Sequence, residues 1–390
     1  MLIYIHIPYC KQACYYCDFH FRVAMKDRDA MLDSMKKEIA LRKDYLRMND
    51  AVEEKIPVET LYFGGGTPSV LSIDELNGLM DAVSQYYSLA PDAEITLEAN
   101  PDDLTDEYLH ELHSLGFNRL SIGIQSFSDD DLRWMNRRHS AREAVQSIDA
   151  AHCAGFSNIN IDLMYGLPAM TQSRWEANLS QALALDTPHL SAYHLSIEPR
   201  TVFGRQQKKG KVFAIPEDES IRQFETLTDA MEKAGYEHYE ISNFARPCFR
   251  SRHNSAYWRQ QPYIGIGPAA HSYDGQSRQW NICNNTEYIA ILERASLPLS
   301  EEQQDLLWFE RELLTPVEQY NDYVLVSLRT AWGTDIEYIR RHFGNTFADT
   351  FLQQAGIYIQ NGSMQEQTGV YTLTRKGKMM ADRIASNLFF

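Results

Sequence analysis

Three cysteines near the start of the chain have a spacing suited to a metal cluster. Cys10, Cys14 and Cys17 follow an alternating apolar run, residues 2–7, and lie in the segment HIPYCKQACYYCDF. Three thiolates from one short loop can hold three irons of a cubane cluster and leave the fourth iron open to a small molecule. Zinc is the alternative that the spacing leaves open, because His20 would complete a tetrahedral set of four ligands.

The composition limits the classes of protein to which the chain can belong. Only six cysteines occur in 390 residues, and three of them are scattered, so a disulfide framework is not indicated. No secretory leader and no apolar stretch of about 18 residues is visible, so we expect a cytoplasmic protein without a transmembrane segment. The net charge of −16 argues against nucleic acid as a partner, and we interpret the basic run at 205–211 as solvated loop charge.

Alternating strand and helix signals run through the first two-thirds of the chain. Gly116, Gly155 and Gly235 each separate a helical pattern from an aromatic residue and a strand pattern, which is typical of a left-handed helix end. Two capping-box patterns, at residues 72–75 and 140–143, mark helix starts. The predicted strands are residues 2–7, 59–63, 94–98, 119–124, 158–163, 190–195 and 238–241, and the predicted helices are 27–48, 74–87, 142–153 and 218–234.

This rhythm predicts an α/β fold built from parallel βα units. We expect a partial (β/α)6-type barrel over residues 1–245, with doubly wound strand order as the alternative. A connecting segment would occupy residues 246–298, and a small, mostly helical domain residues 299–390. In that last part, residues 316–328, 335–342 and 375–386 look helical, and residues 370–373 look like a short strand.

Polar or glycine residues follow the predicted strands at the same end. They include the glycine-rich turn GGGTP at 64–68, Glu98, Gln125, Asp162 and Tyr193. The carboxyl ends of strands form the active face of an α/β barrel, so these groups would converge there. Each also has a structural reading: a glycine triplet can be a plain tight turn, a carboxylate can cap a helix or form an ion pair, and an amide can be buried and satisfied.

Several of these segments together resemble a known family over most of the chain. The cysteine motif, GGGTP, EANP at 98–101, SIGIQSF at 121–127 and NIDLMYGLP at 160–168 are similar to the radical S-adenosylmethionine (SAM) superfamily. The closer likeness is to the branch of oxygen-independent coproporphyrinogen III oxidase and its relatives. The resemblance implies a radical SAM barrel, a [4Fe-4S] cluster whose open iron is chelated by SAM, and a reductant for the cluster. It also implies that residues 299–390 form a small winged-helix-like domain.

The resemblance also implies roles for individual residues. The three cysteines would hold the cluster, Tyr4 would flank the nucleoside, and Tyr16 would shield the cluster or touch the adenine. The groups implied to bind SAM or to lie over an inner pocket, where the coproporphyrinogen-oxidising relatives hold a second SAM, are Gly65, Gly66, Thr67, Glu98, Arg137, Gln125 and Asp162. The glycine-rich run 265–272 would lie near SAM, with His271 as a pocket residue.

The chain differs from the coproporphyrinogen-oxidising enzymes in two features, and one further motif is typical of other members of this branch. The coproporphyrinogen-oxidising enzymes resemble C-x3-C-x2-C-x-C, but Phe19 stands at the fourth cysteine position, and their long N-terminal segment has no counterpart before Cys10. The residues HNSAYW at 253–258 match H-N-x-x-Y-W, a hallmark of the HemW-type heme chaperones. We therefore expect a heme-binding protein that passes heme to acceptor proteins, with decarboxylation of coproporphyrinogen III as the alternative.

The heme contacts implied by that motif are His253, Asn254, Tyr257 and Trp258. An imidazole can ligate iron, and Tyr and Trp offer flat apolar faces. The alternative from the residues alone is a structural corner, with His and Asn bonded to backbone and the aromatic residues packed as core. Of the other cysteines, Cys153 and Cys283 are interpreted as structural, and Cys248 as a buried thiol or an auxiliary heme contact.

Overall fold

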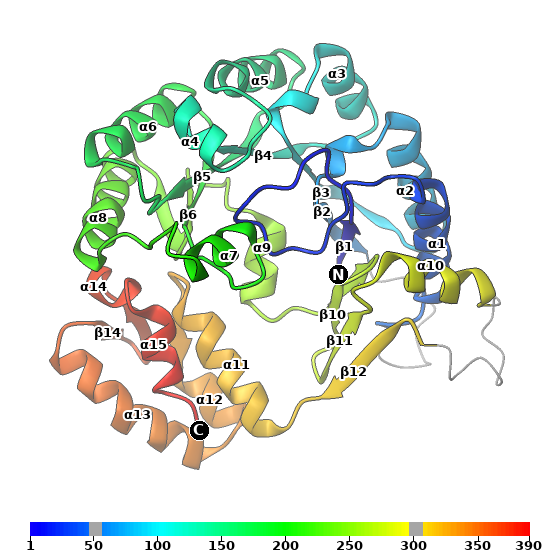
Figure 1. Cartoon of the computed structure of the whole chain (residues 1–390). Helices are drawn as coiled ribbons and strands as arrows, with labels where there is room; N and C mark the ends of the chain where they lie inside the picture. The colour runs from blue at the N-terminus through cyan, green and yellow to red at the C-terminus, as the bar shows by residue number, and fades with distance from the viewer. Residues whose placement is uncertain (47–56, 296–306) are drawn as a thin grey trace.

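The computed structural model describes residues 1–46, 57–295 and 307–390, and its largest element is a sheet of twelve strands. Six parallel strands at its centre follow one another in chain order (Figure 1). They are β1 (Leu2–Ile7), β2 (Val58–Gly65), β3 (Leu89–Ala99), β4 (Arg119–Gln125), β5 (Asn158–Tyr165) and β6 (His189–His194). The six strands show no reversal of order, so the structure has the barrel-type strand order that we predicted and not the doubly wound alternative.

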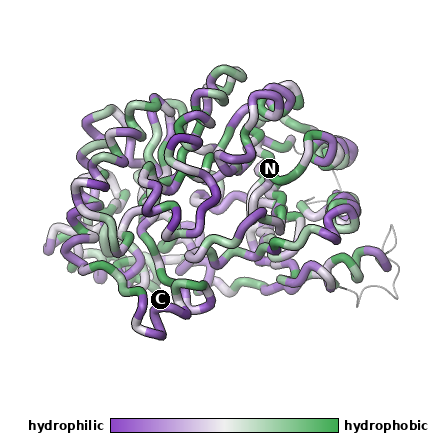
Figure 2. The backbone as a smooth tube through the Cα atoms, turned by 45° about the horizontal axis from the view of Figure 1, so that its top comes forward, coloured by the Kyte–Doolittle hydropathy of each residue, from purple (hydrophilic) through white to green (hydrophobic). Residues whose placement is uncertain are grey.

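Helices on the outside of the curved sheet connect these strands (Figure 1). The longer ones are α1 (Arg28–Leu41), α2 (Ile73–Tyr86), α3 (Asp106–Ser114), α5 (Ala141–Cys153), α6 (Gln172–Ala184) and α8 (Glu217–Lys233). Short elements lie in the connections: η1 (Pro68–Val70), η2 (Pro101–Asp103), α4 (Asp129–Trp134) and α7 (Val202–Lys208). Hydrophobic and hydrophilic residues alternate along the outer helices (Figure 2), as expected where one helix face packs on a sheet.

Further strands extend both sides of the parallel core, so the sheet described here is open. On the β1 side lie β9 (Tyr263–Ile266), β10 (His271–Tyr273), β11 (Ser277–Asn281) and β12 (Phe309–Leu313). On the β6 side lie β8 (Asn243–Ala245) and β7 (Glu237–Glu240), antiparallel to their neighbours. Two more helices, α9 (Arg252–Trp258) and α10 (Asn285–Arg294), belong to this connecting region.

The local signals in the sequence explain where several elements begin and end. Both predicted capping boxes form, with Ser72 at the start of α2 and Ser140 at the start of α5. The three punctuating glycines have φ of +99°, +100° and +81°, so each ends its helix in the left-handed region. Every residue of β4 is buried, which is expected for a parallel strand covered on both faces.

Some predicted boundaries differ from the structure. Helix α1 ends at Leu41 and a turn follows, while the last two residues of the predicted helix 27–48 lie outside the described residues. Strand β3 begins at Leu89, five residues earlier than predicted. The predicted helix 375–386 is two short helices, α14 (Arg375–Lys378) and α15 (Ala381–Ser386).

The C-terminal part has its own hydrophobic core, formed by residues between Tyr320 and Leu388. It contains α11 (Pro316–Leu328), α12 (Ile336–His342) and α13 (Asn345–Gln360), and a small sheet of β13 (Thr334–Asp335), β15 (Val370–Leu373) and β14 (Met364–Gln367). The sequence analysis missed α13. The proposed boundary at 298/299 lies outside the described residues, and β12 beyond it still pairs with β11.

Backbone bonds attach this part to the edge of the main sheet. The amide of Ala331 donates to the carbonyl of Tyr239 at 2.9 Å, and the amide of Ile241 donates to the carbonyl of Arg329 at 3.0 Å. Among the helices of the described ranges, none combines the length and apolar character needed to cross a membrane.

Candidate functional site

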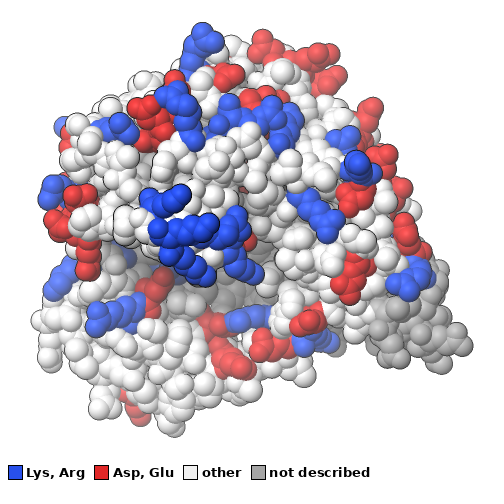
Figure 3. Space-filling view, viewed as in Figure 1, with Lys and Arg blue, Asp and Glu red and all other residues white. Residues whose placement is uncertain are grey.

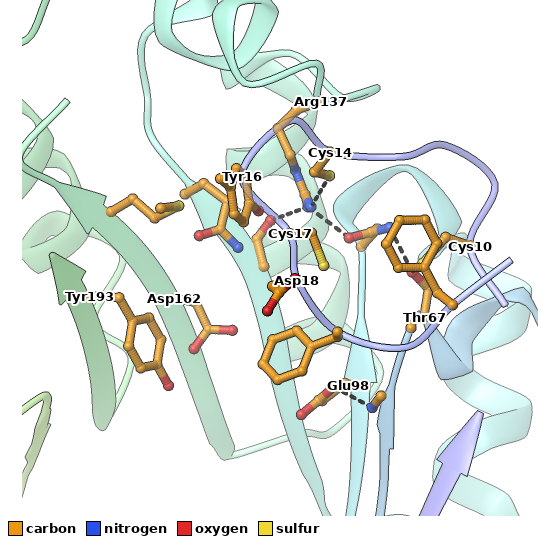
Figure 4. A pocket seen from close by; sticks show the side chains of 18 of the residues that line it. Cys10, Cys14, Tyr16, Cys17, Asp18, Thr67, Glu98, Arg137, Asp162 and Tyr193 are labelled. Atoms are coloured by element: carbon orange, nitrogen blue, oxygen red, sulfur yellow. Dashed lines mark hydrogen bonds between the residues drawn. The ribbon is translucent and has the colours of Figure 1, made fainter. Parts of the chain in front are cut away.

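A cavity of about 530 Å³ opens at the carboxyl ends of the parallel strands (Figure 4). Its volume lies within the usual range for small-molecule sites. The cysteine loop after β1 forms one wall, and the ends of β2 to β6 contribute the floor and the opposite wall. The predicted site residues that line it are Cys10, Cys14, Tyr16, Cys17, Gly65, Gly66, Thr67, Glu98, Gln125, Arg137 and Asp162.

Two of the three thiols receive a hydrogen bond from a neighbouring side chain. The Cys10 sulfur accepts from the Thr67 hydroxyl at 3.3 Å, and the Cys14 sulfur accepts from Arg137 Nη1 at 3.5 Å. Burial raises the pKa of Cys10 to about 12 and that of Cys17 to about 11. The thiolate forms of these residues therefore require a positively charged partner, and a metal centre bound by the loop would supply that charge.

The zinc alternative depends on His20, and the structure places that ring elsewhere. His20 Nδ1 lies 3.1 Å from the Cys283 sulfur, and His20 Nε2 lies 2.6 Å from Asn285 Oδ1. In the described ranges, no group of three or more His, Cys, Asp or Glu side chains is arranged around a single metal position. The donor set that remains is three cysteines facing one cavity, which fits a cluster with an open iron better than a closed tetrahedral site.

Arg137 lies in the loop before α5, and its side chain reaches the cysteine loop. Its Nη2 donates to Asn100 Oδ1 at 2.7 Å and to the carbonyl of Gly123 at 2.6 Å, while Nη1 reaches Cys14. Its Nε is buried and has no hydrogen-bond partner within the part of the chain that the structure describes. A buried donor of this kind suits a carboxylate ligand beside the cluster loop. Asn100, which orients the guanidinium, was not singled out from the sequence, although it lies in the EANP run.

Two partly buried carboxyl groups face the cavity, Glu98 from β3 and Asp162 from β5. Glu98 accepts hydrogen bonds from the Tyr62 hydroxyl at 2.8 Å and from the amide of Gly65 at 3.1 Å. Burial raises the pKa of Glu98 to about 7 and that of Asp162 to about 6. Asp162 also accepts from Asn160 Nδ2 at 2.8 Å. Near neutral pH these groups can therefore either accept hydrogen bonds from a ligand or donate a proton to one.

The glycine turn is required by the packing of the chain itself. A Cβ on Gly66 would lie 2.6 Å from the carbonyl oxygen of Tyr9, and a Cβ on Gly65 would lie 2.7 Å from the His6 ring. Gly65 also has φ of +111°, a region that favours glycine. The close approach that these glycines permit is thus between β2 and the β1 loop, and the same backbone also lines the cavity.

Tyr4 and the H-N-x-x-Y-W residues are not among the residues that line this cavity. Tyr4 lies in the middle of β1, and its hydroxyl lies 3.1 Å from His6 Nδ1, so its expected place beside the nucleoside stays a prediction. Trp258 stacks under the guanidinium of Arg329 from the C-terminal part. His271 is exposed on β10 and is also absent from the cavity wall.

His253 is buried against β2 and β3. Its Nδ1 lies 2.6 Å from the Thr60 hydroxyl, its Nε2 lies 2.8 Å from the Tyr257 hydroxyl, and its amide donates to Glu94. The ring stacks on Tyr62 at 4.8 Å between centroids, and burial lowers its pKa to about 3. The ring nitrogens of His253 thus contact two side-chain hydroxyls, not backbone groups as the structural-corner alternative had it, and heme contact through this motif stays a prediction.

The scattered cysteines are exposed in the structure. Cys153, Cys248 and Cys283 all lie at the surface as free thiols, so the expectation of a buried thiol at Cys248 is wrong. Only Cys283 among them contacts a histidine in the described residues.

Comparison with known proteins agrees with this geometry. Residues 4–182 match the family model "Radical SAM superfamily". The chain is 32% identical over 384 residues to "Heme chaperone HemW" of Bacillus subtilis, which covers 98% of this chain and 97% of that protein. The chain belongs to the HemW family. Escherichia coli HemW is 39% identical over 277 residues, 69% of each chain.

A solved structure shows how far the fold of this HemW-family chain extends. Coproporphyrinogen III oxidase (HemN) from Escherichia coli, described as a radical SAM enzyme, superimposes with a TM-score of 0.82 over 100% of this chain and 89% of its own. Its sequence identity to this chain is 24%, so the likeness establishes the fold alone. The expected radical SAM architecture with a small, mainly helical C-terminal part is confirmed.

Proposed function

We propose that this protein is a heme chaperone, which binds heme, keeps SAM on a [4Fe-4S] cluster and passes the heme to acceptor proteins in the cytoplasm. The observation that carries the proposal is the 32% identity to a curated heme chaperone over nearly the whole of both chains. The cavity supports it, since its wall combines three cysteines with buried polar groups suited to SAM.

Cys10, Cys14 and Cys17 are the residues that would hold three irons of the cluster. When bound and reduced, such a cluster supplies an electron that can cleave the sulfonium of SAM. Arg137 would pair with the SAM carboxylate through its free Nε, and Glu98 would accept from a nearby ligand hydroxyl or amine. Thr67 and Arg137 would donate to the cluster thiolates, which stabilises their negative charge.

Heme would be carried rather than made. Phe19, at the position of the oxidases' fourth cysteine, is 72% exposed and lines the cavity with Phe21. An exposed aromatic face suits a planar apolar macrocycle and supplies no sulfur.

The experiment that tests this proposal compares cargo with substrate. The anaerobically reconstituted protein is incubated with SAM, a low-potential reductant and coproporphyrinogen III, and the tetrapyrroles are then separated by chromatography. We expect unchanged coproporphyrinogen, and a parallel sample should transfer bound heme to a heme-free acceptor protein. Formation of protoporphyrinogen would overturn the chaperone proposal in favour of the oxidase.

A further inference from the structure

Three chemically different groups lie on or beside the short segment Asp18–Phe19–His20 at the mouth of the cavity. Phe19 lines the cavity and is 72% exposed. Arg200 Nη2 donates to Asp18 Oδ2 at 3.0 Å, and the sulfur of Cys283 lies 3.1 Å from His20 Nδ1. An aromatic face, a cation and a thiol therefore meet beside the cluster loop.

The Cys283 thiol lies beside an imidazole that is held in place by a buried side chain. His20 Nε2 lies 2.6 Å from the side-chain oxygen of the buried Asn285. The other ring nitrogen, Nδ1, lies within hydrogen-bonding distance of the Cys283 sulfur, at 3.1 Å. Cys283 itself is exposed, so an incoming ligand can reach its sulfur.

Basic residues gather next to this segment although the chain as a whole carries a net charge of −16. Figure 3 shows Lys and Arg side chains clustered beside the central hollow, over α7 and the residues that follow it. Lys208, Lys209 and Lys211 are exposed and form no ion pair with the acidic side chains of the described residues. The amide of Phe203 donates to the carbonyl of Tyr15 at 3.0 Å, which fixes α7 against the cysteine loop.

We propose that heme binds at the cavity mouth, with its ring plane against Phe19, its iron ligated by Cys283, and its propionates paired with the cationic segment 200–211. This inference rests on the proposed heme-binding function and specifies the site. Heme requires an apolar face, an iron ligand and cations for two carboxylates, and this surface offers all three.

Ligation at this site is a simple exchange. The bond between iron and its water ligand breaks, and a bond between iron and the Cys283 sulfur forms. The thiol proton passes to solvent water at this exposed sulfur, and the oxidation state of the iron does not change. His20, held by Asn285, keeps its ring against the sulfur and is a positioning residue for this ligand.

The test is a hemin titration of the full-length, cluster-reconstituted protein, followed by absorbance. The variants are Cys283→Ser and His20→Gln, and Cys248→Ser is the matched control because Cys248 is also an exposed, free cysteine. We expect Cys283→Ser to bind hemin at least tenfold more weakly and to lose the strongly red-shifted Soret band that a thiolate gives to the ferrous carbonyl adduct. His20→Gln should weaken the same band, and Cys248→Ser should titrate like the unchanged protein.

A second set of variants tests the cations. Replacing Lys208, Lys209 and Lys211 by Glu should weaken hemin binding several-fold and remove its dependence on salt, while a heme dimethyl ester should bind the unchanged and the triple variant alike. Hemin binding that is identical in the unchanged protein and in Cys283→Ser would overturn the site while leaving heme binding intact. Failure of the unchanged protein to bind hemin would overturn the proposed function as well.

Discussion

Replacing His253 with alanine separates two roles for the H-N-x-x-Y-W motif. In the structure both ring nitrogens of His253 are bonded, to the Thr60 and Tyr257 hydroxyls at 2.6 and 2.8 Å, and the ring is buried. Alanine would remove the partner of the buried Thr60 hydroxyl and of the partly buried Tyr257 hydroxyl, and it would leave a cavity next to Tyr62. We therefore expect His253→Ala to act first on stability.

The magnitude follows from these contacts. An unsatisfied buried polar group costs roughly 1–3 kcal/mol, so two such groups lower the free energy of unfolding by about 2–5 kcal/mol once some relaxation is allowed. For 390 residues, an unfolding entropy of about 2.1 cal/mol/K per residue gives ~0.8 kcal/mol/K. The expected drop in the unfolding midpoint is therefore about 2–6 °C.

Differential scanning fluorimetry of the unchanged protein, His253→Ala and His110→Ala measures this drop. His110 is an exposed residue of α3, so its variant controls for the loss of an imidazole at the surface. Hemin titration well below the midpoint should then give equal affinity for all three proteins. An unchanged midpoint in His253→Ala together with lost hemin binding would refute this reasoning and assign the motif to heme.

Four further predictions follow from the site. Alanine at Cys10, Cys14 or Cys17 should abolish the broad visible absorbance of the reconstituted cluster, while alanine at the exposed Cys153 should leave it unchanged. Arg137→Lys should weaken SAM binding at least tenfold in equilibrium dialysis, because lysine cannot replace a guanidinium that bonds Asn100, Gly123 and Cys14 at once; equal SAM affinity would argue against the role given to Arg137. Burial raises the pKa of Glu98 from 4.5 to about 7, so the folded chain binds this proton more tightly than the unfolded chain. The resulting stability is present below about pH 4.5 and is lost as the pH rises through 7. Glu98→Gln should therefore flatten the decline in thermal midpoint of the ligand-free protein between about pH 5 and 8, and a parallel decline in both proteins would contradict this. Gly66→Ala should destabilise the fold by about 1–3 kcal/mol in urea titrations because its Cβ meets the Tyr9 carbonyl, whereas Gly78→Ala, whose nearest atoms belong to the flexible Lys36 side chain, should stabilise α2 by about 0.5–1 kcal/mol.

The sequence predicted the parallel core and most of the cavity because their signals are local. Capping boxes, helix-ending glycines and apolar strands each specify an element within a few residues, and parallel strands place the residues that follow them at one end. Glu98, Gln125 and Asp162 could therefore be expected to line one cavity, as they do, whereas Arg137 was expected there only from the family resemblance.

The remaining features depend on contacts between distant parts of the chain. The Cys283–His20 pair joins residues 263 positions apart, and no spacing rule connects them. Likewise, the contacts of His253 with Thr60 and Glu94 attach α9 to strands that lie about 160 to 190 positions earlier in the chain, and no local pattern predicts them. Within a single strand, the position along the strand also matters. Tyr4 lies in the middle of β1 and not at its carboxyl end, and it is not among the residues that line the cavity.

The most direct test of the central claim is the stoichiometry of heme bound by the reconstituted, full-length protein. Hemin is added stepwise under anaerobic conditions, with SAM present, and the bound fraction is measured by absorbance after removal of free heme. The proposed chaperone function predicts saturation at about one heme per chain. A titration without saturation, or with no heme retained, would contradict it.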